Sequence, residues 1–392
     1  MEQTKKILLQ AAKQYESSLF SIACDIFDHP ECGGEEIYAS NLLIAFLESK
    51  GFHVERCVGG LETAFRATWE RGNGGPAIGF LMEYDALRNM GHACGHHLQA
   101  PACIGAALAL MESCEDAFKL VLYGTPDEEN QGGKITMERN GCFRDVDVMF
   151  SCHAGTKTFV GYTNRALAPT RVTFHGTPAH ASGAPEKGRS ALDAMLLTFH
   201  GLEILREHIQ DGCRIHYTVL EGTGASNIVP ATAKAHITLR SYDRRYLEDM
   251  QKRMENAVKG GCLMTDTTAE FEYRNVYWNL LPVQSLRQLV LQTAEELNAE
   301  KLSAETDRSG GSSDVGNVSW VVPTVLLYTY FSDANAHTQQ WVEAGKTENA
   351  RNCMGSAARI MGLSALKLIK DGQQLKKIKE DHRIALGDSL KI

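Results

Sequence analysis

Four side chains that commonly bind transition metals lie within six consecutive positions of the segment MGHACGHH, residues 90–97. They are His92, Cys94, His96 and His97, and only glycine and alanine lie between them. Small residues leave room for a metal ion close to the backbone. Cys94 and His96 are two positions apart, so on an extended segment their side chains point to the same side. The spacing predicts that this segment supplies ligands to a metal site.

Other candidate ligands stand far from this segment in the sequence. Glu128 and Glu129 follow one strand-like run, and His153 ends a second. His337 lies in a loop after a third. Taken singly, each has a common explanation, because lone histidines are usually structural, a lone cysteine is usually core, and adjacent carboxylates usually face solvent. In open α/β sheets, however, bound molecules lie beyond the carboxyl ends of the strands. Because these side chains all stand near predicted strand ends, the joint pattern predicts one shared site.

The residue types indicate the chemistry of that site. A thiolate, imidazoles and a carboxylate suit zinc or another late divalent metal, and manganese stays open. Five protein ligands are too many for one tetrahedral catalytic zinc but suit two metal ions that share a bridge. A water between two divalent ions is acidified and becomes a nucleophile. A glutamate that is not a ligand can take its proton and deliver it to a leaving amine, which predicts different roles for the two adjacent glutamates.

The elements that must position these residues alternate along the first part of the chain. The first fifty residues predict two helices that are separated by HPECGGEE. Strand-like runs and a helix follow: strands at 63–69, 77–82, 119–124 and 146–151, and a helix at 98–113. The last part predicts a helix, a strand, further helices and a charged tail: 283–298, 324–330, 343–369 and the residues beyond. This alternation predicts an α/β sheet domain.

The middle of the chain has a different pattern. Its order is strand, helix, strand, strand, helix, strand, which matches the ferredoxin-like split unit. We therefore predict an inserted domain at 166–276, and a catalytic metal-binding domain made of 1–165 and 277–392.

Bulk properties exclude several classes of protein. The 392 residues suggest two to three domains, and the net charge of -8 comes without a basic stripe, so no nucleic acid is expected as a partner. The longest apolar run, ACIGAALALM, is about ten residues, well short of a membrane span. The eleven cysteines form no regular framework, and the N-terminal segment has no sustained apolar core. These features predict a cytoplasmic location with reduced thiols.

Together with these features, a set of motifs resembles the M20 family of metallopeptidases and amidohydrolases, in the subfamily whose loop reads HACGH. The motifs span nearly the whole chain: HPECGGEE, EYDAL, GHACGH, GTPDEENQGGK, CHAG, GTPAHASGAPEKGRSALDA, GASNIVP, GSSDVGNVSWVVP and AHT. EYDAL and SSDVGNVS look most like the branch with aminobenzoyl-glutamate hydrolases and M20 dipeptidases. The resemblance implies a zinc-exopeptidase-like mixed sheet sandwiched by helices, with an inserted ferredoxin-like α+β lid and dimerisation domain.

The resemblance also implies a role for each matched residue. The implied metal ligands are Cys94, His96, Glu129, His153 and His337. Glu128 matches the general acid/base.

In the inserted domain, the resemblance implies that the chain forms a homodimer and that His180 reaches the neighbouring subunit's active site to steady the substrate carbonyl oxygen. Asn227 and Arg240 resemble positions that bind the substrate's carboxylate or carbonyl. Asp314 matches a position near the site but receives no role.

Two positions depart from the family pattern. His97 stands where the family usually has Asp or Asn, and we predict that it supports the ligands through hydrogen bonds instead of joining them. The family usually has a proline directly after DAL, and this chain has Arg88 there instead. This difference predicts a loop of different shape. Neither change removes a matched ligand.

The sequence thus predicts a dinuclear metal-dependent amidohydrolase that cleaves a small N-acyl amino acid or dipeptide-like amide with a free carboxylate. Arg240 is the best candidate to hold that carboxylate, because its fork can bind both oxygens. One alternative makes Cys94 a covalent nucleophile with His92 or His96 as base. Another is a non-catalytic metal-binding protein on the same fold.

Overall fold

The computed structural model describes residues 1–222, 224–304 and 308–388. It divides the chain into two compact units. The first, called unit 1, contains 1–163, 280–309 and 313–392, and the second, unit 2, contains 164–279 and 310–312. The sequence placed the insertion at 166–276. Its patterns carried no sign that the short segment 310–312 would pack with the inserted unit.

Unit 1 is built on a seven-stranded mixed sheet with the order β1-β2-β4-β3-β5-β11-β6. Its strands are β1 (His53–Arg56), β2 (Phe65–Arg71), β3 (Ala77–Met82), β4 (Phe118–Gly124), β5 (Val148–Gly155), β6 (Phe159–Val160) and β11 (Thr324–Tyr330). The four central strands β4, β3, β5 and β11 are parallel, so their carboxyl ends lie at one edge of the sheet. This confirms the predicted α/β class.

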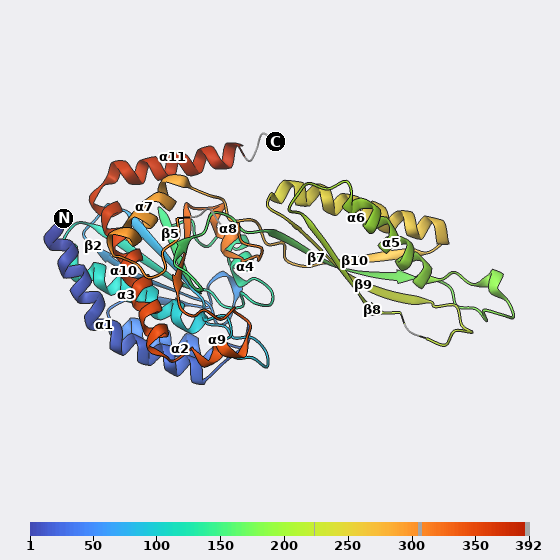
Figure 1. The fold of residues 1–392 in the computed structure, drawn as a ribbon, viewed down its shortest axis with the longest axis horizontal. Coiled ribbons are helices and arrows are strands. Elements are labelled where there is room, and N and C mark those ends of the chain that lie inside the picture. Colours follow the sequence, from blue (N-terminus) through green and yellow to red (C-terminus); the bar gives the residue numbers. More distant parts are fainter. Residues whose placement is uncertain (223, 305–307, 389–392) are drawn as a thin grey trace. The chain divides into compact units, whose positions relative to one another are not determined.

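Helices cover both faces of this sheet (Figure 1). They are α1 (Glu2–Asp28), α2 (Ile37–Ser49), α3 (Gln99–Ser113), α4 (Gly133–Arg139), α7 (Gln284–Glu296), α8 (Val315–Ser319), α9 (Gln339–Glu343), α10 (Glu348–Lys370) and α11 (Gly372–Asp388). Successive side chains of each strand point to opposite faces of the sheet, so each face has its own hydrophobic core. Phe80 and Leu122 join the core with α1, α3 and α10, whereas Leu81 and Val121 join a smaller core with α4 and α8.

Two predicted elements of unit 1 differ from the structure. The charged tail is helix α11, because Leu375, Ile378 and His382 recur at helical spacing and are buried. The helices predicted at 343–369 begin later, with α10 at Glu348, where the side chain of Thr347 accepts a hydrogen bond from the Ala350 amide; the short helix α9 ends at Glu343, before them. The short strands β1 and β6 were not predicted.

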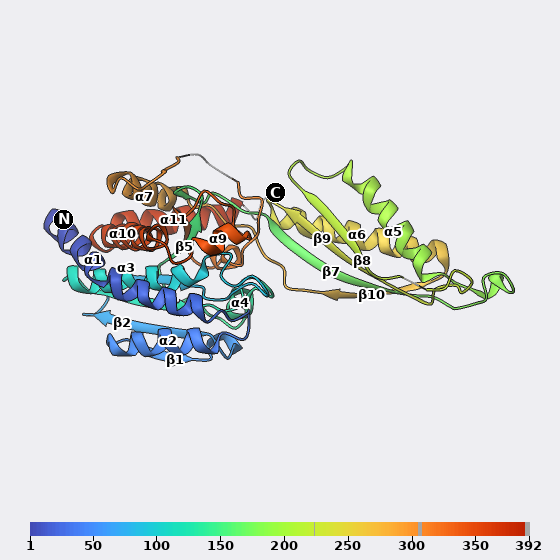
Figure 2. The same ribbon diagram turned by 60° about the horizontal axis from the view of Figure 1, so that its bottom comes forward.

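Unit 2 has the predicted strand and helix order. Its elements are β7 (Ala166–His175), α5 (Ala191–Arg206), β8 (Arg214–Glu221), β9 (Thr232–Ser241), α6 (Arg244–Thr265) and β10 (Thr268–Tyr273). The sheet is antiparallel with the order β10-β7-β9-β8, so β8 and β10 are edge strands. Helices α5 and α6 cover one face, where they bury alternate residues of β7 and β9 (Figure 2).

Among the described residues, none of the helices combines the length and the apolar character that crossing a membrane requires. All eleven cysteines are free thiols.

Candidate metal centre

The parallel strands of unit 1 bring the predicted ligands to one edge of the sheet. Cys94 stands just before the 3-10 turn His96–Leu98 that leads into α3. Glu128 and Glu129 lie in the loop after β4, and His337 lies in the loop after β11. His153 lies within β5 and not beyond it, two residues before that strand ends.

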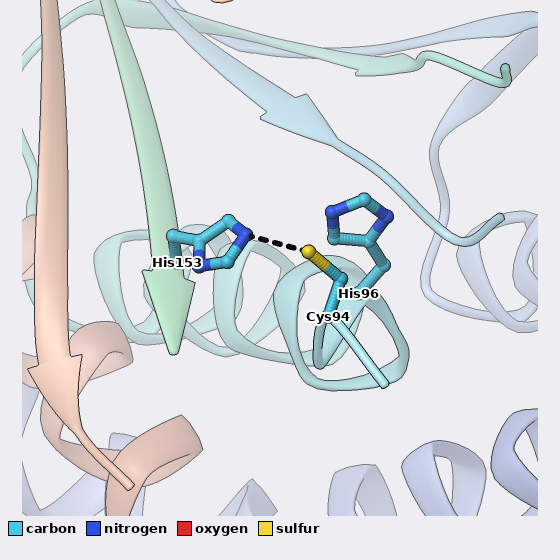
Figure 3. Close-up of side chains that lie close together, drawn as sticks. All are labelled: Cys94, His96 and His153. Carbon is cyan, nitrogen blue, oxygen red and sulfur yellow. Dashed lines mark hydrogen bonds between the residues drawn. The ribbon is translucent and has the colours of Figure 1, made fainter. Parts of the chain in front are cut away.

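Cys94, His96 and His153 form the first of three groups that could hold a metal ion (Figure 3). Their ligand atoms all lie within 4.8 Å of one another. The Cys94 Sγ atom is 3.6 Å from His153 Nε2. The imidazole of His153 comes from β5, whereas Cys94 and His96 come from the loop before α3, so three donors from two elements converge.

The other two groups overlap the first. Cys94, Glu129 and His337 form one, with the Cys94 Sγ atom 3.3 Å from His337 Nε2. His96, Glu128 and Glu129 form the other. Shared members mean that the three groups are parts of one cluster.

Asp85 orients two members of the cluster at once. Its carboxylate accepts a 2.8 Å hydrogen bond from His96 Nδ1–H and a 3.0 Å hydrogen bond from the Glu129 amide. Because Nδ1 is taken by Asp85, Nε2 is the ring nitrogen of His96 that remains to bind a cation. That nitrogen and Glu129 Oε1 are buried and have no hydrogen-bond partner. Sequence reasoning missed Asp85, although it stands in the EYDAL motif.

The remaining two histidines of the cluster are held by the backbone. His153 Nδ1–H donates a 2.7 Å hydrogen bond to the Ala154 carbonyl, which leaves Nε2 free to face Cys94. His337 has a left-handed backbone with φ of 65°, and its amide donates to the Ala93 carbonyl at 2.9 Å. This hydrogen bond ties the C-terminal loop to the segment that contains Cys94.

A buried ion network lies behind His96. Lys134 is fully buried, and its Nζ atom is 2.7 Å from a carboxylate oxygen of Glu83 and 2.7 Å from one of Asp314. The other Glu83 oxygen accepts from Gln99 Nε2 at 2.5 Å and lies 3.3 Å from His96 Nε2. Asp314, to which the sequence assigned no role, is thus the second counter-ion of Lys134.

Burial and charge set the protonation of the cluster. Burial raises the pKa of Cys94 to about 12, because the positive charge of His96 opposes this rise only in part. Burial also raises the pKa of Glu128 well above its usual value, and the charges of Glu83 and Asp314 add to the effect. Without a cation, the Cys94 thiol is therefore protonated at neutral pH, and the surroundings of Glu128 favour its protonated form.

The loop that carries Glu128 and Glu129 is anchored by the HPECGGEE segment. Glu36 is fully buried, and its carboxylate accepts from the Asp127 amide at 2.8 Å and from Thr63 Oγ1 at 3.0 Å. Gly33 lets Asp127 approach closely, since a Cβ there would lie 2.1 Å from Asp127 Oδ1. These contacts fix the start of the loop.

His92 and His97 hydrogen-bond backbone carbonyls and do not belong to the three groups. The Nε2 atom of His92 lies 3.1 Å from the Ile26 carbonyl, and that of His97 lies 2.9 Å from the Gly345 carbonyl. Burial lowers the pKa of His92 to about 4, so the ring is neutral and donates from Nε2. Arg88 is exposed and forms a surface ion pair with Glu35 at 3.4 Å.

The glycine at position 95 has a role that the sequence did not predict. The sequence predicts that small residues here leave room for a metal ion. Gly95 has φ of 90°, and a Cβ on it would lie 3.0 Å from the Ala154 side chain. The glycine therefore serves a left-handed turn and close packing against β5.

In unit 2, the structure separates the candidate substrate-binding residues. His180 and Asn227 lie in neighbouring loops, where the Ala181 amide donates to the Asn227 carbonyl at 2.9 Å. Both are exposed. Arg240 lies near the far end of β9, eight residues after the strand begins, and its Nη1–H donates to Ser312 Oγ at 3.0 Å. At about 3.3 Å per residue, roughly 25 Å separates the two places.

Known proteins similar to this chain agree with these features. Residues 162–263 match the family model described as a peptidase dimerisation domain. The chain is 32% identical over 384 residues to the Xaa-Arg dipeptidase of Homo sapiens, covering 93% of this chain and 88% of the relative. It is 31% identical over 442 residues to one of the subunits of the p-aminobenzoyl-glutamate hydrolase of Escherichia coli, covering 92% of this chain and 91% of that subunit.

A solved structure from Bacillus subtilis, described as a dinuclear metal binding peptidase from the M20 family, superposes with a TM-score of 0.65. The superposition covers 88% of this chain and 98% of that one at 17% identity, so it shows a shared fold.

Proposed function

This chain belongs to the M20 family of metallopeptidases and amidohydrolases, and we propose that it cleaves the amide bond of a small N-acyl amino acid or dipeptide-like substrate with two metal ions. The family makes it a metal-dependent hydrolase of C–N bonds. The number of ions, the residues that hold them and the steps of the reaction are parts of the proposal. The observation that carries it is the overlap of the three ligand groups around Cys94 and Glu129.

The donor set fits two adjacent divalent ions. His96 Nε2 and Glu129 Oε1 are buried polar atoms without a hydrogen-bond partner, which is costly unless a cation binds them. Cys94, His96 and Glu129 each belong to two groups, as expected where the ligands of two adjacent ions would lie side by side. Cys94, His96, Glu129, His153 and His337 would hold the ions, zinc or manganese. When bound, such ions polarise the amide carbonyl and lower the pKa of a water.

Glu128 is the proposed general acid/base. Its backbone neighbour Glu129 belongs to two of the groups, whereas Glu128 belongs to one, which leaves it for proton transfer. With cations bound beside it, Glu128 would be ionised and could take a proton from the attacking water; burial and the nearby carboxylates favour the protonated form, which would then donate to the leaving nitrogen. The same carboxyl then returns to its starting state.

The substrate class follows from the two relatives and from Arg240. The names Xaa-Arg dipeptidase and p-aminobenzoyl-glutamate hydrolase both describe amides of an amino acid. We propose that this chain likewise acts on a small amide with a free carboxylate. The guanidinium of Arg240 is half-buried and oriented by Ser312, so it can bind both carboxylate oxygens.

A homodimer through unit 2 would complete the site. His180 Nδ1 accepts hydrogen bonds from the Ser182 and Gly183 amides, so Nε2 carries the proton and can donate to a carbonyl oxygen. Because His180 and Arg240 lie at opposite ends of one sheet, a single copy of unit 2 cannot place both on one small molecule. Two copies can, and we propose that His180 and Asn227 act on the neighbouring subunit's substrate.

The edge of the unit 2 sheet offers a surface for this dimer. Strand β8 is an edge strand, and Val219 and Leu220 on it are 50% and 49% exposed. Leu196 and Ile204 of α5 are 53% and 59% exposed. An exposed apolar edge strand pairs readily with another strand, so a second copy of this chain would cover it. The match of residues 162–263 to a peptidase dimerisation domain supports a dimer through unit 2.

The alternative in which Cys94 is a covalent nucleophile has less support. A nucleophilic cysteine needs a low pKa, whereas burial raises that of Cys94 to about 12. It would also leave the convergence of Glu129, His153 and His337 on this thiol without a purpose.

The pair Glu128→Gln and Glu129→Gln tests the proposal. We expect Glu128→Gln to lower kcat by about 1000-fold, within the range for general acid/base catalysis, and to retain the wild-type metal content. Glu129→Gln should lose metal as well as activity. Glu48→Gln, an exposed change on α2, is the matched control and should leave both unchanged. Substantial turnover by Glu128→Gln would reject its assigned role.

A further inference from the structure

The sheet of unit 2 has one open face. Helices α5 and α6 bury the residues Ala166, Ala168, Ile237 and Leu239 on the opposite face. The intervening residues of β7 and β9 are partly exposed, and because side chains alternate along a strand they point away from the helices. Strand register therefore decides which side chains share the open face.

Along much of this open face, cations are neutralised by carboxylates on the same sheet. Arg171 and Arg274 both contact Glu272, at 3.6 and 3.5 Å. Lys234 contacts Glu221 at 2.7 Å. Such cross-strand pairs are the usual arrangement on a solvated sheet face.

The end of the face where β9 finishes is different. Arg214 and Arg240 stand directly opposite each other on β8 and β9, so their side chains share the open face. On its other side, Arg240 is paired directly with Leu167 of β7, which therefore shares the open face. Arg165 stands two residues before Leu167, and residues two apart along a strand lie on the same face. Like charges placed directly opposite each other destabilise a sheet.

The side chains of these three arginines donate hydrogen bonds to neutral groups. Arg165 donates to the Gly212 and Gly310 carbonyls, Arg214 to the Cys213 carbonyl, and Arg240 to Ser312 Oγ. Within the described part of the chain, none of the three forms an ion pair. The side chain of the nearby Asp243 accepts instead from the first amides of α6.

The neighbouring groups respond to this positive charge. Burial lowers the pKa of His216, and the charges of Arg240, Arg206 and Arg214 lower it further. Burial and the charge of Arg165 lower the pKa of Arg240. The three arginines thus form a positive site that the protein itself does not neutralise.

We propose that Arg165, Arg214 and Arg240 bind a dicarboxylate, the acidic amino acid part of the substrate, so that amides of glutamate or aspartate are preferred. This inference rests on the proposed function. One carboxylate needs one guanidinium fork, and the opposed pair Arg214 and Arg240, with Cα atoms about 5 Å apart, offers a second fork beside the first. A substrate with a lysine or arginine side chain would add a fourth cation to this place.

Arg214→Gln is the cleanest test, because Arg214 is exposed and its side chain donates to one neighbouring carbonyl. Benzoyl-glutamate, benzoyl-glutamine and benzoyl-lysine share one acyl group and differ in side-chain charge. Wild type should have the highest kcat/KM on the glutamate compound and the lowest on the lysine compound. Arg214→Gln should lower kcat/KM for benzoyl-glutamate by about 10- to 100-fold, mainly through KM, and change that for benzoyl-glutamine less than about 3-fold.

Arg171→Gln is the matched control on the same sheet face, because Glu272 already neutralises Arg171. It should leave all three substrates unchanged. A wild-type preference for benzoyl-lysine, or an equal loss on both other substrates in Arg214→Gln, would overturn the proposal.

Binding of glutarate to chelator-treated protein, measured by calorimetry, separates this inference from the proposed function. Glutarate should bind wild type more tightly than the monocarboxylate butyrate does, and Arg214→Gln should remove the difference. That result would support the site even if none of the amides were cleaved. Equal glutarate binding by wild type and Arg214→Gln would overturn it.

Discussion

The candidate residues of unit 1 and those of unit 2 are held in different ways. In unit 1, His96 and His153 are oriented by hydrogen bonds to Asp85 and to the backbone; His96 is buried and His153 is half-buried. In unit 2, His180 and Asn227 are exposed on loops. Buried, supported side chains are preorganised for chemistry. We therefore place the reacting centre of the proposed function in unit 1, and we propose that a further molecule fixes the positions of His180 and Asn227.

The largest effect should come from removing His180 and then restoring it from another subunit. His180→Ala should lower kcat by about 100- to 1000-fold, the usual loss when a donor to a developing oxyanion is removed. Co-expression of His180→Ala and Glu128→Gln chains should restore activity, because one site of the mixed dimer then has Glu128 from one chain and His180 from the other.

A second mixed dimer is the control for subunit exchange. One of its chains is wild type, and the other chain has both His180→Ala and Glu128→Gln. If the two single variants stay inactive together although they exchange, His180 acts within its own subunit.

A smaller effect is expected where unit 1 loses orientation but keeps its ligands. Asp85→Asn should weaken metal affinity by about 10- to 100-fold, because His96 and the Glu129 amide lose their common acceptor. A metal-buffer titration measures this affinity, with Asp249→Asn on the exposed face of α6 as the control. Unchanged affinity in Asp85→Asn would show that the packing of α3 alone orients His96.

The smallest effect concerns the anchor of the Glu128 loop. Burial raises the pKa of Glu36 to about 7, above the value of about 4.3 for an unfolded chain. Between about pH 4.3 and about pH 7, Glu36 holds its proton in the folded protein but has released it in the unfolded chain. The stabilisation that Glu36 contributes to the folded state is therefore lost as pH rises toward 7.

Glu36→Gln, which stays neutral, should remove that dependence, so its melting temperature relative to wild type should rise by a few degrees between about pH 5 and about pH 8. Thermal unfolding monitored by circular dichroism measures the difference. Parallel pH profiles for the two proteins would contradict the raised pKa of Glu36.

The sequence predicted most elements because their patterns are local. Strands β3, β8 and β11 and helix α3 follow from alternation or helical spacing within a few residues. Helix α11 was missed because its many charges concealed the buried positions Leu375 and Ile378.

Within the candidate site, the sequence predicted the residues with unusual spacing. It did not predict the residues that hydrogen-bond and orient them. Cys94 and His96 stand out because ligand types are crowded into one segment. Asp85 and Lys134 do not, because charged residues usually face solvent and their partners are distant in sequence: Lys134 pairs with Asp314, 180 positions away. Such pairing becomes visible only when the fold brings the strand ends together. The ligand roles themselves stay predictions.

Metal content per chain, measured together with amide hydrolysis before and after chelation, tests the central claim most directly. We predict close to two metal ions per chain, loss of hydrolysis on chelation and its return with zinc or manganese. Protein that holds no metal and hydrolyses amides equally well after chelation would contradict the account and move Cys94 from ligand to nucleophile.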